Sequence, residues 1–260
     1  MENKQKKLII FDFDGVFNLN SMEAYYHTYD KALLESGIVM SSEKQKEIID
    51  SVWGSSHKDI VMELLRADAG DITDPDSIPR VDEDFFKKAL NSYEEILAED
   101  FPEIIAPVPG ASQMLGRLAN RYTLALNTAA DPEVLLEKVM PKVGIQPDYF
   151  QGGMIMAMTL TDDRIAQPKP HPYTTNKLME QNNVEPDETI MVGDSGADIE
   201  TAIYAGVREI YVPLTGKLTA DEVREYGAIP LRTVTSLEGK LGSLGVGGSL
   251  GYKYRLSTFK

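Results

Sequence analysis

Residues 6–21 read KKLIIFDFDGVFNLNS, and this stretch decides which fold the sequence predicts. An apolar run, Leu8–Phe11, leads directly into Asp12, and Asp14 and Gly15 follow after one more phenylalanine. A short apolar run that ends at turn residues is typical of a strand buried inside a sheet. Side chains two residues apart share one face of a strand, so we expect both carboxylates to reach one substrate if the chain stays extended.

The rest of the chain alternates similar apolar runs with helical patterns. Three further buried strands are predicted at Tyr122–Leu126, Thr189–Gly193 and Glu209–Val212. Helices are predicted at Ala111–Ala119, Pro132–Met140, Pro172–Gln181 and Ala197–Ala205. Strands that alternate with helices of this length form crossover units around a parallel sheet. The predicted fold class is therefore α/β, with a Rossmann-like parallel sheet and helices on both faces.

One region interrupts this alternation. Residues 18–102 show no strong strand pattern, but their apolar residues recur three and four positions apart, as in amphipathic helices. We expect this region to be a helical cap domain inserted into a catalytic core made of residues 1–17 and 103–238. The glycine-rich segment 239–260 carries only basic charged side chains and is expected to be a loosely packed tail.

Composition narrows the classes of function. The 260 residues carry a net charge of −15, which repels nucleic acid and anionic membranes, so we expect neither as a partner. No apolar run approaches the ~20 residues of a membrane span, and residues 1–7 lack the apolar stretch of a signal peptide. Cysteine is absent, which excludes disulfides and thiolate chemistry. We expect a cytoplasmic protein, and the sequence leaves its oligomeric state open.

Polar residues stand where the predicted strands end. Ligands of an open parallel sheet bind beyond the carboxyl ends of its strands. Asp12, Thr128 and Asp194 each lie at such an end, and Lys169 precedes a helix. Clustered carboxylates repel one another unless a cation joins them, and Mg²⁺ prefers carboxylate oxygens, waters and phosphate. Asp12 and Asp194 are the first candidates for magnesium ligands, with Asp198 as a nearby ligand or supporting carboxylate.

This set of residue types suits phosphoryl transfer. The reaction needs an in-line nucleophile, neutralisation of the charge on the moving phosphoryl group, and a proton for the leaving oxygen. A carboxylate can be the nucleophile, and Mg²⁺, Lys169 and Thr128 can stabilise the phosphoryl oxygens. An isolated D-x-D pair usually belongs to a turn, and an isolated lysine to the surface. The combination, in this order and at strand ends, favours the functional interpretation.

These residues resemble the four motifs of the haloacid dehalogenase superfamily of phosphohydrolases. DFDGV at 12–16 is similar to the first motif, Thr128 to the second, KPHP at 169–172 to the third and GDSGAD at 193–198 to the fourth. The stretch VPGASQMLGRLANRYTLALNT at 108–128 also resembles the phosphoglycolate phosphatase and β-phosphoglucomutase group. A helical insert directly after the first motif is similar to the cap domain of that group.

The resemblance implies roles for the acidic residues. Asp12 would be the nucleophile and would also bind magnesium. Asp14 would be the general acid and base, and its backbone carbonyl would be a further magnesium ligand. Asp194 would bind magnesium, and Asp198 would support the site or bind the ion as well.

The resemblance also implies substrate contacts. Thr128 and Lys169 would hold the phosphoryl group, beside Asn127, which stands where the family usually has an apolar residue. His57 and Lys58 follow a glycine and polar residues, similar to the substrate-recognition loop of the group's cap. A helix start with exposed His57 and Lys58 explains the same pattern equally well.

The leading hypothesis is a Mg²⁺-dependent phosphatase that hydrolyses a small phosphomonoester metabolite through an aspartyl phosphate. A sugar phosphomutase similar to β-phosphoglucomutase would use the same motifs and pass the phosphoryl group to a sugar hydroxyl instead of water. A protein that binds a phosphometabolite without turnover is the alternative of another class. It is disfavoured because Asp12, Asp14, Lys169 and Asp194 are all present. The sequence does not name the phosphomonoester.

Overall fold

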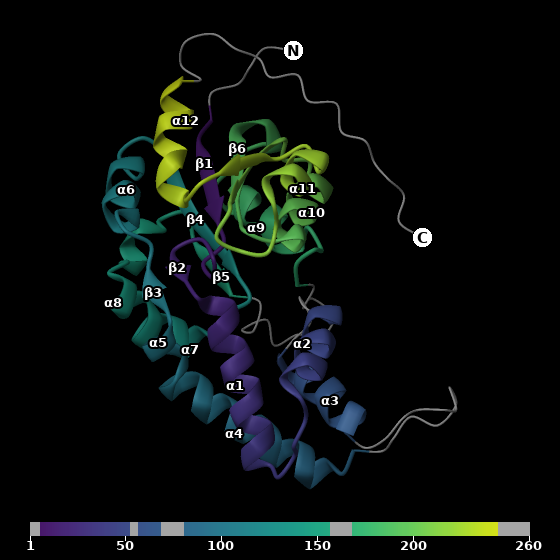
Figure 1. Cartoon of the computed structure of the whole chain (residues 1–260). Helices are drawn as coiled ribbons and strands as arrows, with labels where there is room; N and C mark the ends of the chain where they lie inside the picture. The colour runs from purple at the N-terminus through teal and green to yellow at the C-terminus, as the bar shows by residue number, and fades with distance from the viewer. Residues whose placement is uncertain (1–5, 53–56, 69–80, 157–167, 244–260) are drawn as a thin grey trace. The chain divides into compact units, whose positions relative to one another are not determined.

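The computed structural model describes residues 6–52, 57–68, 81–156 and 168–243 (Figure 1). The chain divides into two compact units, which we call the core unit and the helical unit. The core unit comprises Met1–Leu19 and Ala106–Lys260, and the helical unit comprises Asn20–Ile105. These boundaries lie a few residues after the predicted ones, at 17/18 and 102/103.

The core unit contains a six-stranded sheet in the order β5-β4-β1-β6-β7-β8 (Figure 1). All neighbouring strands are parallel. The strands are β1 (Leu8–Phe11), β4 (Thr123–Thr128), β5 (Met154–Met156), β6 (Thr189–Val192), β7 (Glu209–Pro213) and β8 (Ile229–Leu231). From β1 the chain adds β4 and β5 on one side, and then β6, β7 and β8 on the other. Such a reversal of strand order opens a crevice at the carboxyl ends of the strands.

Helical segments connect the strands of the core unit, and the predicted α/β fold class is confirmed. They are α6 (Ala111–Leu118), α7 (Pro132–Val134), the π-turn Leu135–Val139, α8 (Met140–Val143), α9 (Tyr173–Gln181), α10 (Gly196–Tyr204), α11 (Ala220–Glu225) and α12 (Leu237–Ser243), with short 3₁₀ turns at Pro147–Tyr149, Pro186–Glu188 and Val234–Ser236. In Figure 1, α6 and α12 lie on one side of the sheet, and α10 and α11 lie on the other. No helix in the described residues is both long enough and apolar enough to cross a membrane.

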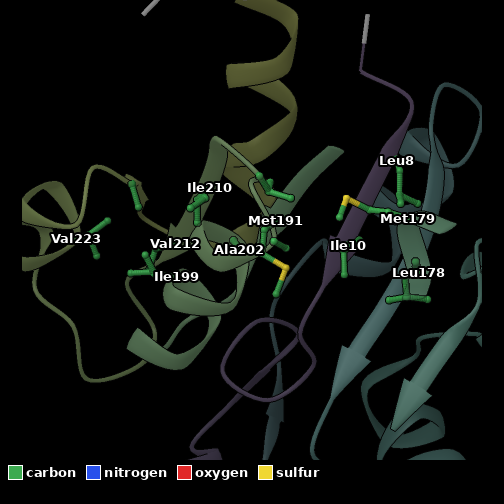
Figure 2. Packing of buried hydrophobic residues seen from close by; sticks show 14 residues of the cluster. Leu8, Ile10, Leu178, Met179, Met191, Ile199, Ala202, Ile210, Val212 and Val223 are labelled. Carbon is green, nitrogen blue, oxygen red and sulfur yellow. The ribbon is translucent and has the colours of Figure 1, made fainter. Parts of the chain in front are cut away.

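Both faces of the sheet are buried. Leu8 and Ile10 of β1 join Met191 of β6 in one apolar cluster with side chains of α9, α10 and α11 (Figure 2). The alternate residues of β1, Ile9 and Phe11, face the other side and are equally buried. A parallel sheet covered on both faces needs continuous apolar strands, which is why these strands were readable in the sequence.

The helical unit has an apolar interior of its own. Its helices are α1 (Ser21–Glu35), α2 (Ser42–Ser51), α3 (His57–Asp68), α4 (Glu83–Glu99) and α5 (Phe101–Ile104). Buried side chains recur at helical spacing, with Tyr25, Tyr29 and Leu33 on α1 and Tyr93 and Leu97 on α4. These apolar faces pack together and exclude water, which is the main source of stability for helices of this length.

The two chain segments that join the units pair with each other. Asn18–Leu19 (β2) and Ala106–Pro107 (β3) form a two-stranded antiparallel sheet. The backbone N–H of Val108 also donates to the carbonyl of Phe17 at 3.0 Å. The exit from the core unit and the return to it are therefore held side by side.

The structure corrects the prediction for the first motif. Strand β1 ends at Phe11, and Asp14 lies in a turn in which the backbone N–H of Phe17 donates to the carbonyl of Phe13 at 2.9 Å. The expectation that Asp12 and Asp14 share one face of a continuous strand is wrong, because the chain turns between the end of β1 and Asp14.

Three smaller differences concern individual elements. Strand β8 was not predicted, because its sequence is three residues long and contains a proline. The helix predicted to end at Met140 continues to Val143 through the π-turn. Helix α12 (Leu237–Ser243) extends into the expected tail region, 239–260, and its Leu237 and Leu241 are buried, so the loosely packed tail does not begin at Gly239. Residues 244–260 lie outside the described residues.

Candidate active site

The core unit places five predicted site residues where its strands end or its helices begin. Asp12 follows β1, Thr128 is the last residue of β4, and Asp194 follows β6. Lys169 precedes α9, and Asp198 lies in the first turn of α10. Phe11, the last residue of β1, pairs with β4 and β6 on either side, so the segments that follow these strands share one edge of the sheet.

Lys169 joins two of the carboxylates. Its Nζ lies 2.9 Å from Oδ2 of Asp12 and 2.7 Å from Oδ1 of Asp198. About a tenth of the Lys169 and Asp12 side chains is exposed, and Asp198 is fully buried. Ion pairs in such surroundings are screened little by salt, so the ammonium group is held in a fixed position between the carboxylates.

Both carboxylate oxygens of Asp198 accept hydrogen bonds, one from Lys169 and the other from Ser195. Its Oδ2 accepts hydrogen bonds from the backbone N–H and the hydroxyl of Ser195 at 3.1 and 2.5 Å, and the Ser195 hydroxyl accepts from the backbone N–H of Asp198. This is a capping arrangement for α10, in which Ser195 is the N-cap. A Cβ at Gly193 would lie 2.3 Å from the carboxyl carbon of Asp198, so only glycine allows this approach. The carboxylate therefore supports the site through Lys169.

The electrostatics of the cluster are dominated by burial. Burial raises the pKa of Asp12 to about 7, against the opposing attraction of Lys169 and together with repulsion from Asp198 and Asp14. Burial, with repulsion from Asp198 and Asp12, holds the pKa of Asp194 well above its usual range. Burial lowers the pKa of Lys169, but the attraction of Asp12 and Asp198 outweighs it and raises that pKa above the ordinary value. Lys169 therefore stays cationic, whereas the carboxylates outnumber the cations that pair with them in the described residues, which favours protonation unless a further cation binds.

The donor set fits a hard divalent cation. One carboxylate oxygen each of Asp12, Asp194 and Asp198 lies within 4.8 Å of the others. Mg²⁺ prefers oxygen ligands and is usually bound through one or two carboxylates, with water and phosphate in the remaining positions. Both oxygens of Asp198 are already engaged by Lys169 and Ser195. Asp12 and Asp194 are therefore the carboxylates best placed to hold the ion.

Asp14 is oriented by a residue that sequence reasoning missed. Asn18, fully buried, donates from Nδ2 to Oδ1 of Asp14 at 2.7 Å and accepts at Oδ1 from the backbone N–H of Gly15 at 2.9 Å. The amide thus closes the turn after β1 and holds the Asp14 carboxylate. An asparagine four residues after the second aspartate of the D-x-D-G motif was the available signal. A side-chain amide that caps a turn is a common use of asparagine.

The two residues at the end of β4 have different surroundings. The hydroxyl of Thr128 accepts from the backbone N–H of Ala130 at 3.2 Å, and as an acceptor in this bond it keeps its own hydrogen for donation. Asn127 is buried and donates from Nδ2 to the hydroxyl of Thr175 on α9 at 3.2 Å. This bond ties β4 to α9, the helix that follows Lys169.

The two predicted residues of the helical unit lie at the start of α3. Nδ1 of His57 lies 2.7 Å from the hydroxyl of Tyr29 and 2.8 Å from that of Tyr93. The ring of Tyr25 stacks on the His57 ring at a centroid distance of 5.3 Å. Lys58 is exposed. Their contact with a substrate stays a prediction.

Comparison with known proteins agrees with the motif pattern. Residues 9–212 match the family model described as haloacid dehalogenase-like hydrolase. A phosphoglycolate phosphatase of Vibrio vulnificus (strain CMCP6) is 28% identical over 207 residues, which cover 79% of this chain and 83% of the relative. A phosphorylated carbohydrates phosphatase of Thermotoga maritima is 24% identical over 224 residues, which cover 86% of this chain and 92% of the relative.

Solved structures share the fold. A protein of Haemophilus somnus assigned as a phosphoglycolate phosphatase superposes with a TM-score of 0.71 at 20% identity, covering 92% of this chain and 99% of that one. A protein of Thermotoga maritima assigned as a β-phosphoglucomutase superposes with a TM-score of 0.65 at 22% identity, with the same coverage. At these identities the likeness concerns the fold alone.

Proposed function

The chain belongs to the haloacid dehalogenase-like hydrolase family and is a phosphohydrolase, and from this premise we propose a more specific activity. It is a Mg²⁺-dependent phosphatase that hydrolyses a small phosphomonoester metabolite through an aspartyl phosphate. The observation that carries the proposal is the cluster of Asp12, Lys169, Asp194 and Asp198 at one edge of the sheet. It combines a carboxylate nucleophile with a fixed cation and a donor set suited to magnesium.

Asp12 is the nucleophile in this proposal. An oxygen of its carboxylate attacks phosphorus, and the bond between phosphorus and the leaving oxygen breaks. Lys169 supports this role in two ways: its positive charge favours the ionised form of Asp12, and it can stabilise the phosphoryl oxygens as negative charge develops on them. The hydroxyl of Thr128 offers a second donor to the same group.

Asp14 is the general acid and then the general base. As an acid it donates a proton to the leaving oxygen, and as a base it takes a proton from the water that hydrolyses the aspartyl phosphate. The bond from Asn18 supports this role, because it fixes one oxygen of Asp14 beside the end of β1. That water attacks phosphorus, the bond between phosphorus and the Asp12 oxygen breaks, and inorganic phosphate leaves with Asp12 again a carboxylate.

Asp12, Asp194 and the backbone carbonyl of Asp14 would hold the magnesium ion, with Asp198 in support. When bound, the ion would neutralise negative charge on the carboxylates and on the phosphoryl group. Burial of Asp12 and Asp194, with fewer cations than carboxylates in the described part of the site, supports this assignment.

The helical unit and the end of β4 would choose the substrate. His57 and Lys58 of the helical unit, and Asn127 beside Thr128, are the proposed contacts to the part of the substrate that leaves. A helical cap that excludes water from the reaction fits a small metabolite better than a phosphorylated protein. The names of the relatives, phosphoglycolate phosphatase and phosphorylated carbohydrates phosphatase, support substrates of this size.

The test is a screen of phosphorylated metabolites with the full chain, with Mg²⁺ or with EDTA, beside the Asp12→Asn variant. The proposal expects release of inorganic phosphate that needs Mg²⁺ and falls by about 10³-fold or more in Asp12→Asn, because the isosteric amide cannot attack phosphorus. Asp148→Asn, at an exposed site in a 3₁₀ turn, is the matched control and should keep wild-type activity. Absence of turnover across the panel would contradict the proposal, and a requirement for a sugar bisphosphate would reassign the protein as a phosphomutase.

A further inference from the structure

The loop after β7 touches Asp194, although no sequence motif marks it. A Cβ built at Gly216 would lie 2.3 Å from Oδ2 of Asp194, 2.9 Å from its backbone oxygen and 3.1 Å from its carboxyl carbon. A Cβ at Gly15 would lie 1.9 Å from the same Oδ2. Real Cβ atoms do not approach other atoms this closely, so any larger residue at either position would displace the carboxylate. Asp194 is therefore enclosed between two glycine backbones.

The turn that contains Gly15 and the loop that contains Gly216 are also joined to each other. The hydroxyl of Thr215 donates to the carbonyl oxygen of Gly15 across the site. The turn after β1, the start of the loop after β6 and the loop after β7 thus meet at Asp194. Strand β7 neighbours β6 in the sheet, which brings this third segment beside the end of β6.

Asp194 depends on this enclosure for its orientation. Within the described residues its carboxylate forms no hydrogen bond or ion pair, in contrast to Asp198, which Lys169 and Ser195 hold from both sides. A carboxylate without donors has no bond that fixes its torsion angles, so the space left by its neighbours decides where its oxygens lie. Gly15 and Gly216 set the limits of that space.

We propose that Thr215 and Gly216 are positioning residues that hold Asp194 in the orientation needed to bind the magnesium ion. The inference rests on the proposed function, because it treats Asp194 as a metal ligand. Gly216 acts by the absence of a side chain, and Thr215 acts by joining its loop to the turn after β1. Neither residue needs to touch the substrate.

Gly216 is a cleaner test than Gly15. Gly15 has φ +70°, so any substitution there strains the backbone as well as crowding Asp194. Gly216 is not among the glycines with positive φ. An alanine at this position therefore reports mainly the contact with Asp194.

The experiment measures Mg²⁺ binding to metal-stripped full-length protein by titration calorimetry, beside phosphatase activity as a function of Mg²⁺. Gly216→Ala should weaken Mg²⁺ binding by about 10–100-fold, the range seen when partners that orient metal ligands are removed. At saturating Mg²⁺ its KM for the phosphoester should stay near the wild-type value, because substrate contacts are unchanged.

Gly152→Ala is the matched control. A Cβ at Gly152 would lie 2.8 Å from the Thr123 side chain and 2.9 Å from the carbonyl of Leu124, so the crowding is similar but lies between β4 and β5. This variant should lower the melting temperature without changing Mg²⁺ affinity. An equal loss of Mg²⁺ affinity in both variants would overturn the inference, because it would show a general effect of crowding.

Thr215 provides a second test if Gly216→Ala does not fold. Thr215→Val keeps the shape and removes the donor, and Thr215→Ser restores the donor. Weaker Mg²⁺ binding in the valine variant with recovery in the serine variant supports the inference. Wild-type Mg²⁺ affinity in folded Gly216→Ala, or in Thr215→Val, overturns it and leaves the proposed function intact. A wild-type protein that neither binds Mg²⁺ nor releases phosphate overturns the proposed function itself.

Discussion

The carboxyl edge of the core sheet and the interior of the helical unit both gather polar side chains, but they balance them differently. At the sheet edge, Asp12, Asp194 and Asp198 lie together, and in the part of the chain that the structure describes one ammonium group, that of Lys169, pairs with this cluster. In the helical unit, the hydroxyls of Tyr29 and Tyr93 converge on Nδ1 of His57, and all three groups can be neutral.

The difference separates a cluster of excess charge from a network of uncharged hydrogen-bonding groups. The tyrosine hydroxyls and the imidazole ring can hydrogen-bond to one another while uncharged, so burying them leaves no charge that a ligand must neutralise. Buried carboxylates in excess of cations repel each other and favour protonation, unless an ion or a substrate restores the balance. The sheet edge differs from the interior of the helical unit in its excess of charge and not in the number of its polar groups.

The variant with the largest predicted effect, Asp14→Asn, removes the general acid and base at the sheet edge. Asp14→Asn keeps the shape and the contact with Asn18 but cannot donate or accept the proton, so kcat should fall by ~10²–10⁴-fold. Steady-state kinetics with the best substrate of the screen measure this. Mg²⁺ affinity should change little, because the backbone carbonyl of residue 14 remains. Activity within a few-fold of wild type would show that Asp14 is only a turn residue.

A second variant removes the Lys169 ammonium group, which is the one cation that pairs with the carboxylates of the cluster among the described residues. Lys169→Met keeps the length of the side chain but leaves Asp12 and Asp198 without their ion pairs. We expect kcat to fall by ~10²–10³-fold, because a preorganised charge on the phosphoryl group is lost. Lys177→Met, at an exposed ion pair on α9, is the control and should leave kcat unchanged. Equal kcat values for the two variants would show that Lys169 does not contribute to catalysis.

The charge imbalance also predicts how stability depends on pH. Burial raises the pKa of Asp12 from 3.8 to about 7, so the folded protein holds this proton more tightly than the unfolded chain does. Without metal, the stability contributed by protonation is present below pH 3.8 and is lost as the pH rises through about 7. Asp194, whose pKa is also raised, acts in the same direction.

Mg²⁺ should therefore stabilise the protein more at pH 8 than at pH 5.5, where it competes with protons. At 100 times its dissociation constant, a ligand that binds only the folded state adds about 2.7 kcal/mol to the free energy of unfolding. Denaturant melts at both pH values, with Mg²⁺ and with EDTA, measure the difference. If Mg²⁺ raised the free energy of unfolding equally at both pH values, the ion would not bind at these carboxylates.

The smallest predicted effect lies in the helical unit. Tyr93→Phe removes one of the two hydroxyls at His57 and should lower the free energy of unfolding by about 1 kcal/mol, the usual value of one hydrogen bond. Mg²⁺ affinity should stay at the wild-type value. If His57 contacts the substrate, KM rises in His57→Ala and less in Tyr93→Phe. A loss of Mg²⁺ affinity in Tyr93→Phe would contradict the separation between the two regions.

Much of the fold could be read from the sequence because of where its apolar residues lie. Strands β1, β4, β6 and β7 are buried on both faces, so each appears as a continuous apolar run. Strand β8 lies at the sheet edge, is three residues long and contains Pro230, so it left no such run. The turn that carries Asp14 was mistaken for strand, because alternation of two side chains also fits a tight turn.

The supporting residues of the site were harder to predict. Asn18 and Ser195 act within a few positions of the aspartates they hold, and the spacing of each could have indicated a cap. Thr215 and Gly216 carry no such signal. Thr215 lies 200 positions from Gly15, whose carbonyl it binds. Such a contact depends on how neighbouring strands place their loops, and no local pattern encodes it.

The sequence by itself determined the α/β class, the helical insert and the set of candidate site residues. These follow from local patterns, namely apolar runs, helical spacing and short motifs at strand ends. Only the tertiary structure decided that Lys169 joins Asp12 to Asp198, that Asn18 holds Asp14, and that two glycine backbones enclose Asp194. Those facts are distances between segments far apart in the chain, and the packing of the sheet sets them.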